Sequence, residues 1–149
     1  NEYIQECLIN QMLSGIFEKE YIAFLEGNLS RASGTINAPI ARKENSIIER
    51  CINENGEKAI THYKLIENKL NFCIVNFKLE TGRTHQIRVH SSHIGHPILG
   101  DTLYGTSSPL IPRQALHALK VRFMHPITKE PVQYVAPIPE DMEKLQFLK

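Results

Sequence analysis

The chain has 149 residues, 42% of them hydrophobic, and its 17 basic and 16 acidic side chains leave a formal net charge of +1. A length of this order is typical of one domain with a packed core, so global disorder is excluded. The near balance of charge also excludes a histone-like protein that holds nucleic acid by bulk charge, although it leaves room for a local basic groove.

The cysteines and the apolar runs indicate the cellular compartment in which the protein is expected. Cys7, Cys51 and Cys73 are widely spaced and form no C-x-x-C pair. An odd number of unclustered cysteines favours a reducing environment, so we expect a cytoplasmic protein. No apolar run approaches the ~20 residues of a membrane span, and no secretory signal opens the sequence.

The first half of the chain predicts one helix followed by strands. Residues 3–14 place their apolar side chains on one helical face, which predicts a helix. Residues 18–26 are rich in β-forming residues and predict a strand. Further strands are predicted at residues 35–37, where Pro39 should end the strand, and at 47–52, 58–66 and 72–79, the last two as an antiparallel hairpin.

The apolar period changes in the second half. Residues 84–94 predict a helix that begins directly after Arg83 and that Gly95 and Pro97 end. Two more strands are predicted at 116–123 and 132–136, and a closing helix at 141–148. We therefore expect one α+β domain over residues 1–149, with a mixed, mostly antiparallel sheet flanked by helices.

Residues 79–105 hold the densest group of candidate functional residues. Arg83 and Arg88 are five residues apart and do not share a helical face, which places Arg83 before the helix and Arg88 inside it. A guanidinium group at Arg88 could pair bidentately with a phosphate or a carboxylate. Two solvated surface arginines explain the spacing equally well. The G-D-x-x-Y-G segment at 100–105 by itself indicates only a tight turn.

Four histidines within twelve residues raise the question of a metal site. His90 and His93 have the i, i+3 spacing that could bind zinc from one helix face. However, the sequence has no H-E-x-x-H, and the nearest carboxylate lies beyond Pro97. Core or hydrogen-bonding histidines are the favoured interpretation of His85, His90, His93 and His96, so we expect no metal.

Lys19 and Tyr21 lie two apart on the strand predicted at 18–26, so their side chains share one face. An aromatic ring beside a cation could hold a base that has left its stack. From composition alone, a half-buried strand tyrosine next to a solvated lysine is the favoured interpretation.

Five ordered motifs resemble one family, the RluA-type pseudouridine synthases. They are KEYIAFLEG at 19–27, TGRTHQIRVH at 81–90, GHPILGDTLYG at 95–105, LHA with a following F-x-H-P at 116–126, and A-P-x-P-x-D-M at 136–142. The resemblance covers nearly the whole chain. It implies isomerisation of uridine to pseudouridine in structured RNA, with ribosomal RNA the expected substrate, and no metal or organic cofactor.

The resemblance also implies roles for individual side chains. Tyr21 is expected to stack on the target base and to serve a late proton transfer. Arg88 is expected to pair with the catalytic aspartate, and Leu116 to pack against the base. The residues expected to support RNA binding are Lys19, Arg83 and His85.

The sequence departs from the family at the catalytic aspartate. That residue lies in an H-R-L-D-x-x-T-S-G motif upstream of the K-x-Y strand, and no such motif is present. Neither Asp101 nor Asp141 matches its position. Because the chain begins at Asn1, we expect an N-terminally truncated domain that is inactive alone and that can self-associate through exposed sheet edges. Two alternatives stay open: a non-catalytic RNA-binding module and a zinc-dependent hydrolase.

Overall fold

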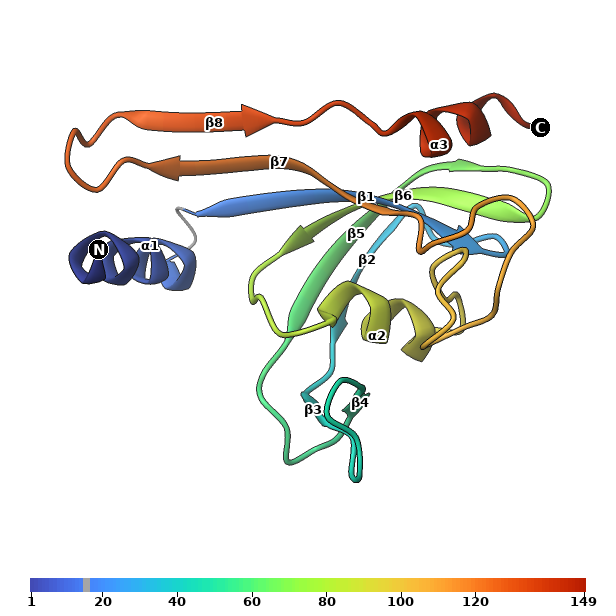
Figure 1. The fold of residues 1–149 in the computed structure, drawn as a ribbon, viewed down its shortest axis with the longest axis horizontal. Helices are drawn as coiled ribbons and strands as arrows, with labels where there is room; N and C mark the ends of the chain where they lie inside the picture. The colour runs from blue at the N-terminus through green and yellow to red at the C-terminus, as the bar shows by residue number, and fades with distance from the viewer. Residues whose placement is uncertain (15–16) are drawn as a thin grey trace.

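Antiparallel strands form the framework of the protein (Figure 1). The structure is a computed structural model and describes residues 1–14 and 17–149. Within these residues a six-stranded sheet has the order β2-β5-β6-β1-β7-β8, and β3 and β4 form a separate two-stranded sheet. The strands are β1 (Glu18–Glu26), β2 (Ser33–Asn37), β3 (Ile40–Arg42), β4 (Arg50–Ile52), β5 (Ile60–Asn68), β6 (Phe72–Leu79), β7 (Leu116–Met124) and β8 (Pro131–Val135).

Helices lie at both ends of the chain and beside the middle of the sheet. They are α1 (Glu2–Ser14), α2 (Gln86–His93), α3 (Glu140–Glu143) and a 3-10 helix, η1 (Lys144–Phe147). In the view of Figure 1, α2 lies below the central strands and α3 above them. The Gln11 side chain fastens α1 to β7, because its amide group both donates to and accepts from the backbone of Met124 at 2.6 and 2.7 Å.

The core lies around the two central strands, β1 and β6. Residues 22–25 of β1 are all 3% exposed or less, so both faces of this strand are covered. A continuous apolar run is what such a strand requires. Ile87 of α2 and Met142 of α3 belong to the same buried cluster. The central strands are therefore a rigid base for whatever lies at their ends.

Most predicted elements are confirmed, and with them the α+β fold. The helix predicted at 3–14 and the strands at 18–26 and 72–79 agree with α1, β1 and β6 to within one residue. The predicted hairpin is the antiparallel pair β5–β6. The closing helix is present but is divided between α3 and η1.

Two predictions were wrong, around the β3–β4 hairpin and at the start of α2. The strand predicted at 47–52 begins only at Arg50, and β3 was missed because Pro39 was taken as the end of strand structure. Ile47 and Ile48 instead lie in the exposed connection, with 83% and 62% of their surfaces accessible. Helix α2 starts at Gln86 rather than at residue 84, because His85 has a left-handed backbone with φ of 57°.

Candidate functional site

One pocket of about 340 Å³ is lined by all six residues that the sequence analysis selected. They come from four different segments: β1, the loop before α2, α2 itself, and β7. The side chains concerned are Lys19, Tyr21, Arg83, His85, Arg88 and Leu116. We call this cavity the central pocket. Residues almost one hundred positions apart in sequence thus line the same space.

Strands β1 and β7 form the aromatic and apolar wall of the central pocket. Tyr21 pairs with Ala118 and Ala23 pairs with Leu116, so Tyr21 and Leu116 project from the same face of the sheet. Burial raises the pKa of Tyr21, and its phenol therefore stays neutral at physiological pH. A neutral ring near a leucine is an arrangement that can hold a planar base by stacking.

The loop that leads into α2 is held by Gln86, which sequence reasoning missed. The Gln86 carboxamide oxygen accepts hydrogen bonds from the Arg83 backbone N–H at 3.0 Å and from the Thr81 hydroxyl at 2.8 Å. Its amide nitrogen donates to Thr61 Oγ1 and to the Ile60 carbonyl at 2.9 and 3.0 Å. The side chain is thus fully committed and fixes the loop that presents Arg83. The sequence feature that could have indicated Gln86 is its i, i+4 spacing from His90, which is also buried.

His85 reaches the central pocket from a left-handed position. Its Nδ1 lies 2.7 Å from the Tyr104 phenol oxygen, which also accepts the Arg50 backbone N–H at 2.9 Å. When Nδ1 carries no proton, the phenol donates its own proton to it while its oxygen accepts from Arg50. Burial lowers the pKa of His85, and the neighbouring charges of Arg88 and Arg50 lower it further.

Arg88 pairs with Asp101 of this same chain. Its Nε and Nη2 donate to the two carboxylate oxygens at 2.8 and 2.9 Å, and its guanidinium lies 5.1 Å from the centre of the Tyr104 ring. The hydrogen bond that Arg88 donates to Asp101 raises the pKa of Arg88. Burial raises the pKa of Asp101, but the bonds from Arg88 and from two backbone amides outweigh it, so the net shift is downward.

This pair gives Arg88 a partner that the sequence analysis did not predict. The resemblance implied an aspartate partner from outside the chain, and the G-D-x-x-Y-G segment was interpreted only as a tight turn. The segment is indeed a turn, but its Asp101 occupies two of the donor positions of Arg88. The spacing of the G-D-x-x-Y-G motif predicts the turn. No local rule, however, predicts that residue 101 in this turn pairs with residue 88.

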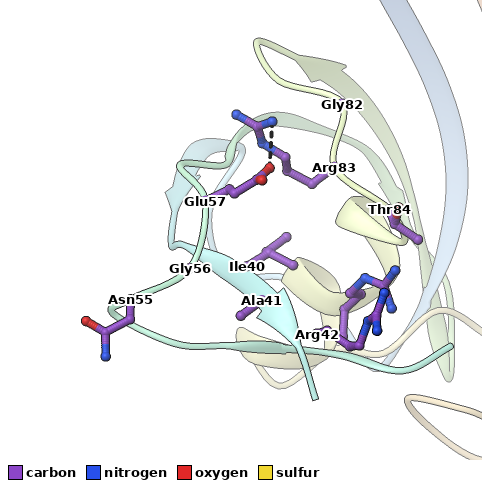
Figure 2. A pocket seen from close by; sticks show the side chains of 10 residues that line it. Ile40, Ala41, Arg42, Asn55, Gly56, Glu57, Gly82, Arg83 and Thr84 are labelled. Carbon is purple, nitrogen blue, oxygen red and sulfur yellow. Dashed lines mark ion pairs between the residues drawn. The ribbon is translucent and has the colours of Figure 1, made fainter. Parts of the chain in front are cut away.

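A second pocket of about 480 Å³ adjoins the first and shares Gly82 and Arg83 with it. The β3–β4 hairpin forms one of its sides, and Figure 2 shows Arg42 and Arg83 around the cavity, on different segments. Arg83 pairs with Glu57 at 2.8 Å and donates through Nε to the Lys58 carbonyl. We call this cavity the hairpin pocket.

The two pockets concentrate positive charge that the whole chain lacks. The basic residues along them are Lys19, Arg42, Arg50, Arg83 and Arg88. Among the lining residues that the structure describes, Glu57 alone is acidic. With a net charge of only +1 over the chain, this is the local basic groove that the composition left possible, and it suits a polyanion.

Three of the four clustered histidines, His85, His90 and His96, take part in hydrogen bonds. His90 is fully buried, and its two ring nitrogens lie 2.7 Å from Thr61 Oγ1 and 2.9 Å from the Ala38 carbonyl. His96 Nδ1 bonds to the Glu26 carbonyl. Over residues 1–14 and 17–149 we find no group of three side chains suited to a metal ion. A membrane span would need a longer and more apolar helix than any in the same residues.

Several known proteins have sequences similar to this chain. The family model described as RNA pseudouridylate synthase matches residues 4–93. The chain belongs to this family. It is 43% identical over 145 residues to an uncharacterized RNA pseudouridine synthase, YjbO, of Bacillus subtilis, and the match covers 97% of the chain and 51% of that protein. It is also 38% identical to the ribosomal large subunit pseudouridine synthase D of Haemophilus influenzae over 161 residues, covering 97% and 49% of the two chains.

Solved structures agree with this membership. Human RNA Pseudouridylate Synthase Domain Containing 1 superposes with a TM-score of 0.76 at 29% identity, over 92% of this chain and 61% of that chain. The RluA-type resemblance drawn from the motifs and the expected fold are thereby confirmed. The chain spans about half the length of the curated relatives it matches.

Proposed function

We propose that the protein containing this chain isomerises uridine to pseudouridine in structured RNA, with ribosomal RNA as its substrate in the cytoplasm. The observation that carries the proposal is the convergence of Tyr21, Arg88 and Leu116 on one pocket beside a basic groove. A base that leaves its stack would enter between Tyr21 and Leu116. The reaction breaks the C1′–N1 bond, turns the base, and joins C1′ to C5. The C5 proton leaves and N1 ends protonated, so no oxidant or cofactor is required.

We assign the RNA backbone to the basic residues. Lys19 and Arg83 line the central pocket, and Arg83 is shared with the hairpin pocket. Phosphates bound there would release counterions, so the affinity should fall as salt rises. His85 is neutral because of its lowered pKa, and we assign it a hydrogen-bonding rather than a charged role.

We further propose that the 149-residue chain does not catalyse this reaction alone. The reaction needs a carboxylate at the ribose, and none lines the central pocket within the described residues. Asp101 is 1% exposed and committed to Arg88, while Asp141 is paired with Arg113 at 2.8 Å. Neither carboxylate is available as a nucleophile.

Release of tritium from C5 of labelled uridine in ribosomal RNA tests both statements. The full-length protein should release tritium, and the 149-residue chain should not. Turnover by the short chain would refute its inactivity. Absence of release by the full-length protein on both free and ribosome-bound RNA would refute the proposed activity.

The second candidate function is RNA binding without catalysis. The central pocket lies in a basic groove and has no carboxylate among the described residues that line it. This observation supports RNA binding, and it is also the reason for proposing that the short chain is inactive. Replacing Arg83 with Gln should weaken RNA binding and reduce the slope of log affinity against log salt by about 1. Arg31, exposed in the loop after β1, is the matched control, and Arg31→Gln should leave the slope unchanged. Equal slopes in both variants would contradict the assignment of Arg83.

Self-association through sheet edges is part of the proposal as well. Strand β8 is an edge of the main sheet, and Tyr134 and Val135 on it are 66% and 60% exposed. Unprotected edges pair readily with other chains. Light scattering should detect dimers or larger species that Val135→Lys removes, and a monomer at all concentrations would refute this point.

A further inference from the structure

We propose that Asp101 is a positioning residue that holds Arg88 so that a single edge of its guanidinium faces the central pocket. The proposal rests on the pseudouridine synthase activity proposed above and adds to it a residue that the sequence analysis left in a turn. Asp101 touches no substrate, because its side chain is fully buried. It acts through Arg88.

Burial makes the pairing difficult to break. One carboxylate oxygen, Oδ1, accepts from Arg88 Nη2 and from the backbone N–H groups of Leu103 and Tyr104 at 2.9 to 3.2 Å. The other oxygen, Oδ2, accepts Arg88 Nε at 2.8 Å. If Arg88 swung toward a ligand, it would leave an uncompensated charge in the protein interior, which is strongly unfavourable.

The turn that carries Asp101 is itself fastened to the sheet. The Asp101 backbone N–H donates to the Ile98 carbonyl at 3.1 Å, and the neighbouring Leu99 N–H donates to the Phe24 carbonyl of β1 at 2.8 Å. Strand β1 also carries Tyr21. Asp101 therefore relates the guanidinium of Arg88 to the strand that forms the aromatic wall of the central pocket.

This arrangement also orients Nη1, the guanidinium nitrogen of Arg88 that does not bond to Asp101. Within the described residues, Nη1 has no hydrogen-bond partner, and it is absent from the buried polar atoms that lack one, so it is accessible. Arg88 lines the central pocket with 14% of its side chain exposed. The Tyr104 ring lies against the guanidinium and limits its movement. An arginine held in this way presents one donor edge at a fixed point.

The chain contains a second arginine–aspartate pair that serves as a control. Arg113 donates through Nε and Nη2 to the two oxygens of Asp141 at 2.9 and 2.8 Å, the same geometry as at Arg88. Asp141 is 39% exposed, and neither residue of this pair lines the central pocket or the hairpin pocket. Loss of the Asp141 carboxylate removes the same kind of pair at a site whose two residues line neither pocket.

The experiment compares Asp101→Asn with Asp141→Asn in the full-length protein. Asp101→Asn should lower kcat for tritium release by about 100-fold, the scale of a reacting group displaced by roughly 1 Å, while KM for RNA changes by less than about 3-fold. Asp141→Asn should leave both constants unchanged. Unchanged kcat in a folded Asp101→Asn protein would overturn the proposal, as would a loss confined to KM.

A second readout does not depend on activity. With ¹⁵N-labelled arginine, the Arg88 Nε–H should give a slowly exchanging signal that disappears in Asp101→Asn and persists in Asp141→Asn. If the full-length wild type is inactive but this signal behaves as expected, the proposed function fails and the positioning geometry stands. A signal that persists in Asp101→Asn overturns the geometry.

A conservative variant, Asp101→Glu, tests the proposal if Asp101→Asn does not fold. If backbone amide spectra show that Asp101→Asn is unfolded, Asp101→Glu decides, because it keeps the charge and moves the guanidinium by one methylene. A folded Asp101→Glu protein with reduced kcat and retained RNA affinity supports the proposal. Full activity overturns it, and so does unfolding of both variants, since Asp101 would then be required for folding rather than for placing Arg88.

Discussion

Tyr104 and His85 are joined by a 2.7 Å hydrogen bond between the phenol oxygen and Nδ1. The same oxygen accepts the Arg50 backbone N–H from β4. A single hydroxyl group thus connects the β3–β4 hairpin to the loop before α2, and so connects the two pockets.

Removing this hydroxyl tests the connection. Tyr104→Phe keeps the ring against Arg88 but leaves the Arg50 N–H and His85 Nδ1 without their partner. The free energy of unfolding should fall by about 1–3 kcal/mol, and amide exchange in β4 should accelerate. Urea denaturation and hydrogen-exchange mass spectrometry measure the two effects. Tyr134→Phe is the control, since Tyr134 is 66% exposed. Similar losses in the two variants would contradict the connection.

The buried hydroxyl of Thr61 offers a prediction about the core behind the site. Thr61 Oγ1 lies 2.7 Å from His90 Nδ1 and 2.9 Å from Gln86 Nε2. Thr61→Val leaves both polar groups buried without this partner, so it should cost about 1–3 kcal/mol of stability by denaturant unfolding. The exposed Thr35–His62 pair has a similar bond of 2.8 Å. Thr35→Val should change stability by less than about 0.5 kcal/mol, and an equal cost would contradict the role of burial.

Stability should decrease as the pH falls through the ordinary pKa of histidine. Burial is the main cause that lowers the pKa values of His85 and His90 in the folded chain. The unfolded chain therefore binds more protons as the pH falls through about 6.5, and the stabilisation present above that value is lost.

Urea unfolding at about pH 7.5 and about pH 5.5 measures this loss. His85→Asn removes one titrating group and tolerates the left-handed backbone, so it should reduce the pH dependence. Greater wild-type stability at the lower pH would contradict the prediction.

At two glycines with left-handed backbones, alanine substitutions can distinguish the energetic cost of the backbone conformation from the cost of a steric clash. Gly95 has φ of +88° and open space where the methyl group of an alanine would lie, whereas at Gly100, with φ of +79°, a Cβ atom would collide with the Arg113 carbonyl oxygen. Gly95→Ala should cost about 1–2 kcal/mol. Gly100→Ala should cost more and should also displace the turn that carries Asp101. Thermal unfolding of both variants checks the order, and an equal or reversed order would contradict it.

Much of the molecule could be predicted from local pattern. The residues at 72–79 predict β6 and those at 18–26 predict β1, since β-forming composition is a property of neighbouring residues. The motif order led to the family and to six of the residues that line the central pocket. Strand β3 escaped because it follows Pro39 directly and is only three residues long, which is too short to establish a period.

Sequence alone determined most of the elements, the family and six of the residues that line the central pocket, because periodicity and motifs are patterns of residues close along the chain. Tertiary structure decided which side chains pair with one another. The bond between Arg88 and Asp101, the four contacts of Gln86 and the hydroxyl shared by His85 and Arg50 join residues as far as 54 positions apart. Such contacts depend on where the folded backbone brings buried polar groups together, and burial then requires that each finds a partner.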